Sequence, residues 1–451
     1  MERSGNAGAD AMKLRPTLRG LGRLALLMTG LALLAALIAL HGAQIEMTPG
    51  GAHKRLLIPV FRQAIAIPIY TGTGEHVLLP DRLDGPVVRR VDAHSWTSTW
   101  YCQDAVHRQA TTGNVLEITC AGKRHAYSLA TVRPPPAISP MPAQVVVLSD
   151  LEGNSTFMEA ALRALSVTGD NGTWTFGTGH LVILGDSVDR GQDVFAVLWR
   201  LRALAAQAQA AGGAVHVLLG NHEQYVLQAN PSRAHPDHRY ALKAMGGYSQ
   251  AFAADTVIGA WLREQPVTLT LGRVLFVHGG ISPAVLETGL GVPGLNAAMH
   301  AYWKNEAHGG HAQRDGNANA VLGLAGVTRY RGYFEALAAS YPAATQAQID
   351  ETLTQFNVDQ IVVGHTLVDR VKQLHGGRVW AVDVNDDEAA AEALVFTNGV
   401  PRVVALGVAR NLGQEPSPRR RRLNLLDTRD WQLLIAMGKE FWTLSRIPQA
   451  Q

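Results

Sequence analysis

Acidic, amide and imidazole side chains follow five short apolar runs in the middle of this 451-residue chain, each just beyond the end of a run. Carboxylate oxygen, amide oxygen and imidazole nitrogen, without thiolate, form a ligand set that suits Mn, Fe or Zn rather than a structural thiolate-bound zinc. Two such ions roughly 3.5–4 Å apart would bind a phosphate and activate a water molecule for in-line attack. The sequence therefore predicts a hydrolytic metal site. Its candidate residues are Asp150 and Glu152, Asp186 and Asp189, Asn221 and His222, His278, and His365.

The five apolar runs are expected to be buried strands of an α/β sheet, because each is short, continuous and bounded by Gly, Asp or His. Residues 155–165 and 193–210 have helical composition, so strands and helices alternate. In such a sheet the carboxyl ends of the strands are where ligands bind. One Asp after a strand is often a helix cap, but capping does not explain five such groups in order. The runs are 145–148, 181–184, 215–219, 274–277 and 361–363.

The motifs around these residues resemble those of the calcineurin-like metallophosphoesterases. Within that superfamily they are most similar to the phosphoprotein-phosphatase type, particularly the bacterial Shewanella-like phosphatases. The resemblance covers about residues 144–385 and implies a four-layer α/β/β/α sandwich. It also implies a dinuclear-metal phosphatase that uses a bridging hydroxide to hydrolyse a phosphate monoester on a phosphoprotein or a small molecule. The motifs are Gly-Asp-x-x-Asp-Arg-Gly at 185–191, Gly-Asn-His-Glu at 220–223, Val-His-Gly-Gly at 277–280 and Gly-His-Thr at 364–366.

The same resemblance implies a role for each residue. His222 would protonate the leaving oxygen, and Asp189 would hold its ring. Arg190 would clamp phosphate oxygens, because a guanidinium matches them in geometry and charge. Arg331, in a Tyr-Arg-Gly segment, would be the second phosphate-binding arginine, with Arg329 as the competing candidate. The implied metal ligands are Asp150 and Glu152 in the first site, Asn221, His278 and His365 in the second, and Asp186 as the bridge.

The first metal site departs from the family pattern. Where the family has Asp-x-His, this chain has Asp150-Leu151-Glu152. The added negative charge favours harder ions such as Mn²⁺ or Mg²⁺ over Zn²⁺. We therefore expect two divalent ions, Mn²⁺ above all, with Fe and Zn as alternatives. Leu367 stands two residues after His365, where nucleases and phosphodiesterases of the superfamily carry a second His, and this favours a phosphatase.

Two other functions stay open. The same site could hydrolyse nucleotides, dinucleoside polyphosphates or phosphodiesters. A non-catalytic metal-binding scaffold would fit the ligands but would need none of Asp189, Arg190 and His222. A phosphorylated substrate is the expected partner, and nothing in the sequence predicts the oligomeric state. The net charge of +3 is small and the middle of the chain has no basic face, so no nucleic acid is expected as a partner.

The N-terminal region predicts export. Residues 24–40 carry no charge, and five Lys or Arg residues precede them within the first 23. Such a run is at the lower limit for crossing a hydrocarbon core of about 30 Å, and the preceding charges predict a cytoplasmic N-terminus. We expect an inner-membrane anchor with the catalytic domain on the periplasmic side, or a secreted protein if the segment is cleaved.

The two cysteines, Cys102 and Cys120, lie in a region with strand-like patterning. In an oxidising compartment they predict a disulfide worth about 2–4 kcal/mol, with two buried thiols as the alternative. Strands are expected at 96–101, 115–119 and 126–131, with a turn at 112–114 between the first two.

A hydrophobic content of 47% with 17% charged residues excludes a disordered chain, and the length allows one large domain with an appendage or two to three domains. After Arg419–Arg422, the residues Trp431, Leu434, Ile435 and Trp442 share one face at helical spacing. This segment would either lie on an anionic membrane surface or dock on the catalytic domain behind a solvated basic linker. The expected parts are a tail with membrane segment (1–45), a small β-rich domain (46–133), a Pro-rich linker (134–143), the catalytic domain (144–406) and a basic C-terminal tail and helix (407–451).

Overall fold

The computed structural model divides into two compact units, which are described separately here. The smaller unit comprises residues 1–76 and 417–451, and the larger comprises 77–416. The domain boundaries expected at 133/134 and 406/407 do not coincide with this division. The structure describes residues 18–47, 54–60, 63–69, 82–103, 105–306, 316–335, 341, 343–384, 390–409, 419–428, 430–432 and 434–435.

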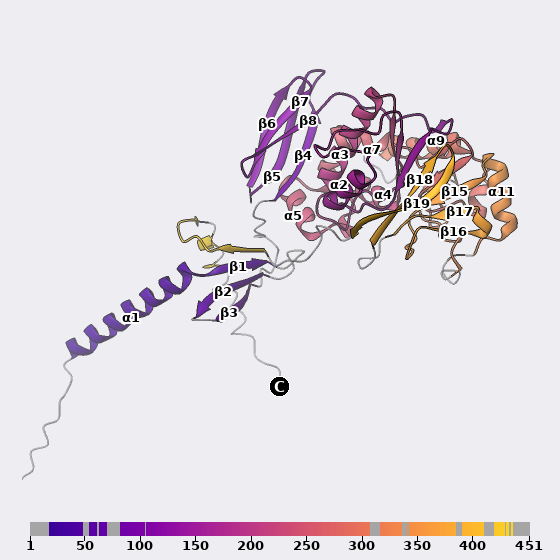
Figure 1. The fold of residues 1–451 in the computed structure, drawn as a ribbon. Helices are drawn as coiled ribbons and strands as arrows, with labels where there is room; N and C mark the ends of the chain where they lie inside the picture. The colour runs from indigo at the N-terminus through magenta and orange to yellow at the C-terminus, as the bar shows by residue number, and fades with distance from the viewer. Residues whose placement is uncertain are drawn as a thin grey trace, which may run out of the picture. The chain divides into compact units, whose positions relative to one another are not determined.

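Two β-sheets form the centre of the larger unit (Figure 1). The first has the order β12 (Ala214–Val217), β11 (His180–Ile183), β10 (Gln144–Leu148), β18 (Ala390–Thr397), β19 (Val400–Ala409). The second has the order β16 (Lys372–Leu374), β17 (Val379–Ala381), β15 (Gln360–Val363), β14 (Val274–Val277), β13 (Thr268–Leu271), β9 (Ile138–Ser139). Strands β10, β11 and β12 are parallel to one another, as are β14, β15 and β17. Their carboxyl ends therefore lie together at one edge of each sheet.

Helices pack on both sheets, and the sheets share one hydrophobic core. The rings of Phe276 on β14 and Phe396 on β18 meet edge to face at 6.1 Å. Helices α2 (Ser155–Ala164) and α3 (Val194–Ala210) contact the first sheet, and α9 (Val292–Glu306) contacts the second. Because both faces of each sheet are covered, the central strands are apolar throughout, as the continuous runs predicted. The larger unit thus has a mixed α/β fold.

Short helices fill the connections that leave the sheet edge. Helix α4 begins at Asn221, directly after Gly220, so its first turn lies at the carboxyl end of β12. The connecting helices are α4 (Asn221–Leu227), η2 (Pro231–Arg233), α5 (Pro236–Ala244), α6 (Tyr248–Ala251), α7 (Val257–Arg263), α8 (Pro283–Leu286), α10 (Gly316–Leu322), α11 (Gln346–Phe356) and η4 (His375–Gly377).

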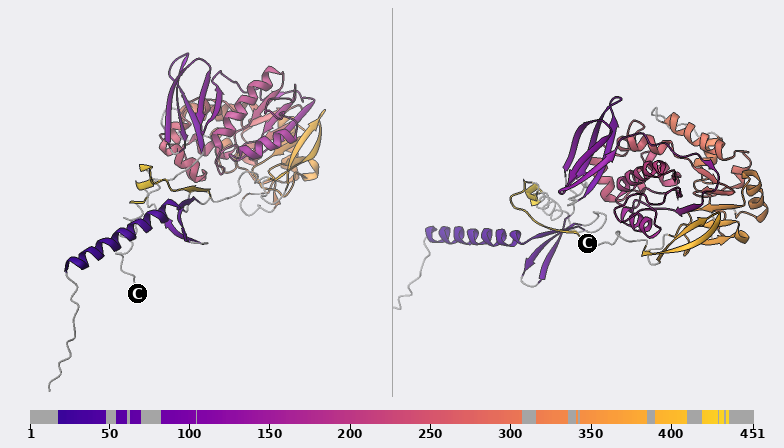
Figure 2. Two further views of the ribbon diagram at one scale, coloured as in Figure 1. Left: turned by 60° about the vertical axis from the view of Figure 1, so that its left-hand side comes forward. Right: turned by 45° about the horizontal axis from the view of Figure 1, so that its top comes forward.

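Five accessory strands, drawn in purple in Figures 1 and 2, pack against helices of the larger unit. Strands β4 (Leu83–Arg90), β5 (Ser95–Cys102) and β6 (Ala105–Thr112) form one sheet, and β7 (Val115–Cys120) pairs with β8 (Lys123–Ser128). The predicted disulfide between Cys102 and Cys120 is present. Strand β6 was not predicted, because most of its residues are exposed and polar, with no alternation of apolar and polar residues. The predicted turn at 112–114 lies between β6 and β7.

The smaller unit contains helix α1 (Leu18–His41) and an antiparallel sheet of order β20, β1, β2, β3. Its strands are β1 (Gln44–Met47), β2 (Lys54–Val60), β3 (Gln63–Ile69) and β20 (Arg419–Arg422). Residues 419–422, for which one expectation was a solvated basic linker, form strand β20, pair with β1, and include Arg420, whose Nε lies 2.8 Å from Glu46 Oε2. Residues 430–432 and 434–435 are helical, and Trp442 lies outside the described residues.

The predicted membrane segment at residues 24–40 is not supported. Among the residues that the structure describes, no helix combines the length and apolar character needed to span a bilayer. The fold class is therefore corrected to a mixed α/β fold with accessory β-sheets, for which the described residues give no support to an N-terminal transmembrane segment.

Candidate metal centre

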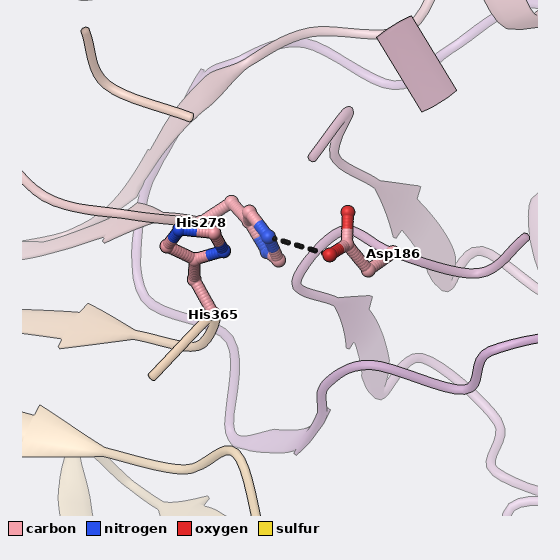
Figure 3. Close-up of side chains that lie close together, drawn as sticks. All are labelled: Asp186, His278 and His365. Carbon is pink, nitrogen blue, oxygen red and sulfur yellow. Dashed lines mark ion pairs between the residues drawn. The ribbon is translucent and has the colours of Figure 1, made fainter. Parts of the chain in front are cut away.

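Three of the predicted ligands meet in a buried cluster at the carboxyl ends of the strands (Figure 3). Asp186 follows β11 of the first sheet, and His278 and His365 follow β14 and β15 of the second. One ligand atom from each lies within 4.8 Å of the others. His278 Nε2 is 3.1 Å from Asp186 Oδ2, and the two imidazole centroids are 5.0 Å apart. Both sheets thus contribute to one potential cation site.

Hydrogen bonds fix which ring nitrogens can bind a metal. His278 Nδ1 lies 2.6 Å from the carbonyl oxygen of Leu184, and His365 Nε2 lies 3.1 Å from that of Arg329. A carbonyl oxygen only accepts, so these nitrogens carry protons, and His278 Nε2 and His365 Nδ1 are the ring nitrogens left to bind a metal. Because burial is outweighed by Asp186 and Asp150, which raise the pKa of His278, its Nε2 would have to release a proton when a metal binds. Burial, and then the charge of His278, lower the pKa of His365 well below its usual value, which keeps its ring neutral.

Asp150 and Glu152 lie on a loop that is bonded to the Asp186 loop. Asp150 N donates to Gly185 O at 3.2 Å, and Glu152 N donates to Asp186 O at 2.9 Å. Asp150 Oδ2 accepts from His365 N at 3.2 Å, which ties this loop to the residue that follows β15 of the second sheet. Burial raises the pKa of Asp150 above its usual value. Glu152 Oε1 forms an ion pair with Arg190 Nη1 at 2.6 Å, so its carboxylate reaches the predicted phosphate clamp.

Asn221 and His222 form the start of α4, next to the Asp186 loop. The Asn221 Oδ1 atom is buried and has no hydrogen-bond partner among the described residues. His222 N donates to Asp186 Oδ1 at 2.9 Å. His222 Nδ1 lies 3.0 Å from Asp189 Oδ2, and its Nε2 lies 3.8 Å from Asp186 Oδ2. Burial alone would lower the pKa of His222, but Asp186 and Asp189 raise it above its usual value.

These residues fit a divalent cation. The cluster offers carboxylate oxygen, neutral imidazole nitrogen and the unpartnered amide oxygen of Asn221, a set that suits first-row metals. The carboxylates also give the cluster a negative potential. Burial alone would lower the pKa of His278, yet the charges of Asp186 and Asp150 raise it to about 10. A bound cation would balance this charge.

Most of the predicted site residues adopt left-handed backbone conformations. Such φ values cost of order 1–3 kcal/mol each for a non-glycine residue and cluster at functional sites. A Cβ atom on Gly220 would overlap with Asp186 Oδ1 and lie 2.8 Å from the backbone nitrogen of Asp186, so this position requires glycine. The left-handed residues are Asp150 (φ 50°), Glu152 (49°), Asp186 (50°), Asp189 (64°), Arg190 (51°) and His365 (62°).

Glu223 is a positioning residue to which the sequence analysis gave no role. Its carboxylate accepts from the backbone N–H groups of Asp186 at 3.0 Å, Ser187 at 2.7 Å and Gly220 at 2.8 Å. Burial raises the pKa of Glu223 to about 7, with the charge of Asp186 adding to the effect. Glu223 thus joins the loops after β11 and β12. Glu223 is the third residue of α4, a position from which a Glu side chain can accept from the N-cap N–H, here that of Gly220, and this position was the available signal.

The three candidate arginines occupy different positions. The Arg190 side chain is 54% exposed beside Glu152. Arg331 Nη2 and Nη1 lie 3.4 Å from His365 Nδ1 and from Thr366 Oγ1, respectively. The Arg329 guanidinium lies over the ring of Tyr225 at 5.0 Å. Arg331 therefore borders the cation cluster directly.

Comparison with known proteins identifies the family. The family model described as calcineurin-like phosphoesterase matches residues 143–369, half of the chain. The chain is a member of this family. The resemblance inferred from the motifs is confirmed, and so is the enzyme class, a metallophosphoesterase. Members of this family use divalent metal ions, which agrees with the donor set of the cluster.

Relatives of this phosphoesterase include several phosphatases. The crystal structure of a cold-active protein-tyrosine phosphatase from a psychrophilic Shewanella species superposes with a TM-score of 0.65 at 30% identity, over 75% of this chain and 99% of that one. Shewanella-like protein phosphatase 2 of Arabidopsis thaliana is 32% identical over 102 residues, 23% of this chain and 24% of that protein. A symmetrical bis(5'-nucleosyl)-tetraphosphatase of Janthinobacterium sp. (strain Marseille) is 29% identical over 136 residues, 30% of this chain and 43% of that protein. The matches thus span less than half the length of these two curated relatives.

Proposed function

We propose that this phosphoesterase is a phosphomonoesterase that acts on a phosphoprotein or a small phosphate ester with two divalent ions, Mn²⁺ above all. The observation that carries the proposal is the meeting of Asp186, His278 and His365 next to the paired His222 and Asp189. When bound, the ions would supply Lewis acidity and make a water molecule nucleophilic near neutral pH. Asp150 and Glu152 would hold one ion, Asn221, His278 and His365 the other, and Asp186 both.

His222 would supply the proton that the leaving oxygen needs. Its Nδ1 is occupied by Asp189 Oδ2, so the protonated imidazole presents Nε2–H to the substrate. The charges of Asp186 and Asp189 favour the protonated ring.

Arg190 and Arg331 would orient the phosphate. Arg190 is exposed enough to receive a ligand while its ion pair with Glu152 keeps it beside the first metal site. Arg331 adjoins His365 of the second site. Two guanidinium groups, one on each side of a phosphate, would each donate N–H groups to its negatively charged oxygens.

Metal restoration tests this function. The protein is stripped with a chelator and supplied separately with Mn²⁺, Fe²⁺, Zn²⁺ or Mg²⁺, and hydrolysis of 4-nitrophenyl phosphate is compared with that of its bis-ester. We expect metal-dependent monoester turnover, fastest with Mn²⁺. Turnover of the diester alone would reassign the protein to the phosphodiesterases, and inactivity with every ion would favour a scaffold.

The relatives named as tetraphosphatases support a second candidate, hydrolysis of dinucleoside polyphosphates. One from Acidovorax sp. (strain JS42) is 36% identical over 107 residues. The ratio of kcat/KM for a phosphopeptide to that for diadenosine tetraphosphate separates the two functions. A ratio well below one would favour the second candidate.

We further propose that the protein works in an oxidising, exported compartment, and the Cys102–Cys120 disulfide supports this. A thiol reagent applied to unreduced cell extract should then label neither cysteine. Labelling of both would contradict export.

A further inference from the structure

A buried arginine of the accessory strands reaches the loop that carries Arg190. Arg82 lies directly before β4 and its side chain is 3% exposed. Its Nη2 donates to the carbonyl oxygen of Gln192 at 2.6 Å. This contact joins residues 110 positions apart in the sequence, and Gln192 is two residues beyond Arg190. Arg82 also lies 3.9 Å from Asp193, the N-cap of α3.

Two further buried groups fix the Arg82 guanidinium. Asp84 accepts a hydrogen bond from Arg82 Nη2, and its Oδ2 lies 2.8 Å from His238 Nδ1 on α5. Both partners are buried, with side chains 2% and 0% exposed. Burial would raise the pKa of Asp84, but His238 and then Arg82 lower it below its usual value. A charged group this deeply buried persists only when it is paired, so the cluster holds Arg82 in one place.

The loop that Arg82 contacts has a backbone that needs support. Asp189 and Arg190 are consecutive left-handed residues, with φ of 64° and 51°. Backbone bonds hold the loop on one side, from Arg190 N to Arg233 O at 3.0 Å and from Gly191 N to Glu152 O at 2.8 Å. On the accessory side, the Gln192 carbonyl is held by Arg82.

We propose that Arg82 is a positioning residue: through the Gln192 carbonyl it holds the 189–193 loop so that the Arg190 guanidinium is in place to receive phosphate. This proposal rests on the proposed function of Arg190. The accessory strands thereby take part in phosphate binding without contacting the substrate.

Arg202 provides a matched control. It is a buried arginine on α3, and its Nη1 and Nη2 donate to the carbonyl oxygens of Ser128, at 2.6 Å, and of Ala130. Arg202 thus also joins the accessory region to a helix, α3, through carbonyl oxygens, but these belong to residues 128 and 130, away in sequence from 189–193. Replacement of either arginine by lysine keeps the positive charge and removes the planar fork.

The test measures the affinity for inorganic phosphate in metal-loaded full-length protein, by competitive inhibition and by phosphate-induced thermal shift. The variants are R82K, R202K, R190A and the double variant R82K/R190A. We expect R82K to weaken phosphate binding about tenfold, as expected for a lost hydrogen bond to a charged group, and to raise KM more than it lowers kcat. R202K should lower the unfolding temperature but leave phosphate affinity unchanged. In the R190A background, R82K should have no further effect on phosphate affinity.

Equal phosphate affinity in wild type, R82K and R202K, with R190A weaker, would overturn the positioning role and leave Arg190 as the clamp. Unchanged affinity in R190A itself would instead refute the proposed function of Arg190. If R82K does not fold, the isosteric variant Asp84→Asn weakens the same cluster, and it should also lower phosphate affinity. Unchanged affinity in a folded Asp84→Asn protein would then overturn the proposal.

Discussion

Asp186 also positions neighbouring residues, in addition to its expected role as a metal ligand. Its Oδ1 accepts from His222 N, its Oδ2 faces His278 Nε2, and its backbone N donates to Glu223. One carboxylate therefore contacts both His222, the proposed acid, and His278, a proposed metal ligand. Substitutions here are expected to affect chemistry before they affect folding, because the backbone contacts remain.

Asp186→Asn should bind less than half of the wild-type metal and lose at least about a hundredfold in activity. The amide keeps the shape and one acceptor oxygen but removes the negative charge. Metal content by mass spectrometry and monoester turnover check this expectation. Asp350→Asn, at an exposed carboxylate on α11, is the control and should match wild type. Full metal content in Asp186→Asn would contradict the bridging role.

His222→Asn should retain metal near the wild-type amount and lower kcat by about 10²–10⁴-fold, the usual contribution of a general acid. The ring contacts Asp189 and Asp186 but is not proposed to bind an ion. The measurement pairs metal analysis with kcat for monoesters. Loss of metal in this variant would be inconsistent with its role as the acid.

At the scale of elements, neighbouring strands β11 and β12 place two histidines in contact. His216 Nε2 lies 3.0 Å from His180 Nδ1, and burial, together with the charge of His180, lowers the pKa of His216 to about 3. In the unfolded chain His216 would become protonated as the pH falls below about 6.5, whereas in the folded chain its ring stays neutral until the pH nears 3. This contribution to stability is complete above about pH 6.5 and is lost as the pH falls toward 3.

We therefore expect the free energy of unfolding to fall more steeply between pH 7 and pH 4.5 in wild type than in His216→Leu. The upper limit of the His216 contribution to this change in the free energy of unfolding is about 2–3 kcal/mol. Urea unfolding at the two pH values measures the free energy of unfolding of each protein. The His216→Leu variant lacks the contribution of His216, whereas the titration of the carboxylates affects both proteins alike. Identical pH dependence in the two proteins would show that His216 is not the buried neutral group.

Local patterns predicted the elements that carry chemistry and missed those whose partners lie far away in the sequence. The apolar runs at 145–148 and 361–363 became β10 and β15, because a strand buried on both faces needs apolar residues at every position. Strand β20 was missed because four consecutive arginines have no strand pattern; its partner, β1, lies more than 370 residues away. The contact between Arg82 and Gln192 was invisible for the same reason.

At the scale of the whole molecule, the larger unit should be autonomous. The division at 76/77 and 416/417 leaves both central sheets, the accessory strands and the metal cluster within one unit. A chain limited to residues 77–416 should unfold cooperatively, bind metal and unfold within a few degrees of the full protein. Calorimetry and metal analysis check this. A chain of 134–416 is the contrast and should be less stable, because it lacks strands that share the core.

The pairing of β1 with β20 has a consequence for how the protein is made. Residues 44–47 leave the ribosome early, but their neighbours at 419–422 emerge only after the whole of 77–416 has been synthesised. Domains generally fold as units during synthesis, so the larger unit can complete its core while β1 still lacks one neighbour. Strand β20, the last strand among the described residues, thus closes the small sheet, and that sheet can be complete only in a chain whose catalytic unit has already been made in full.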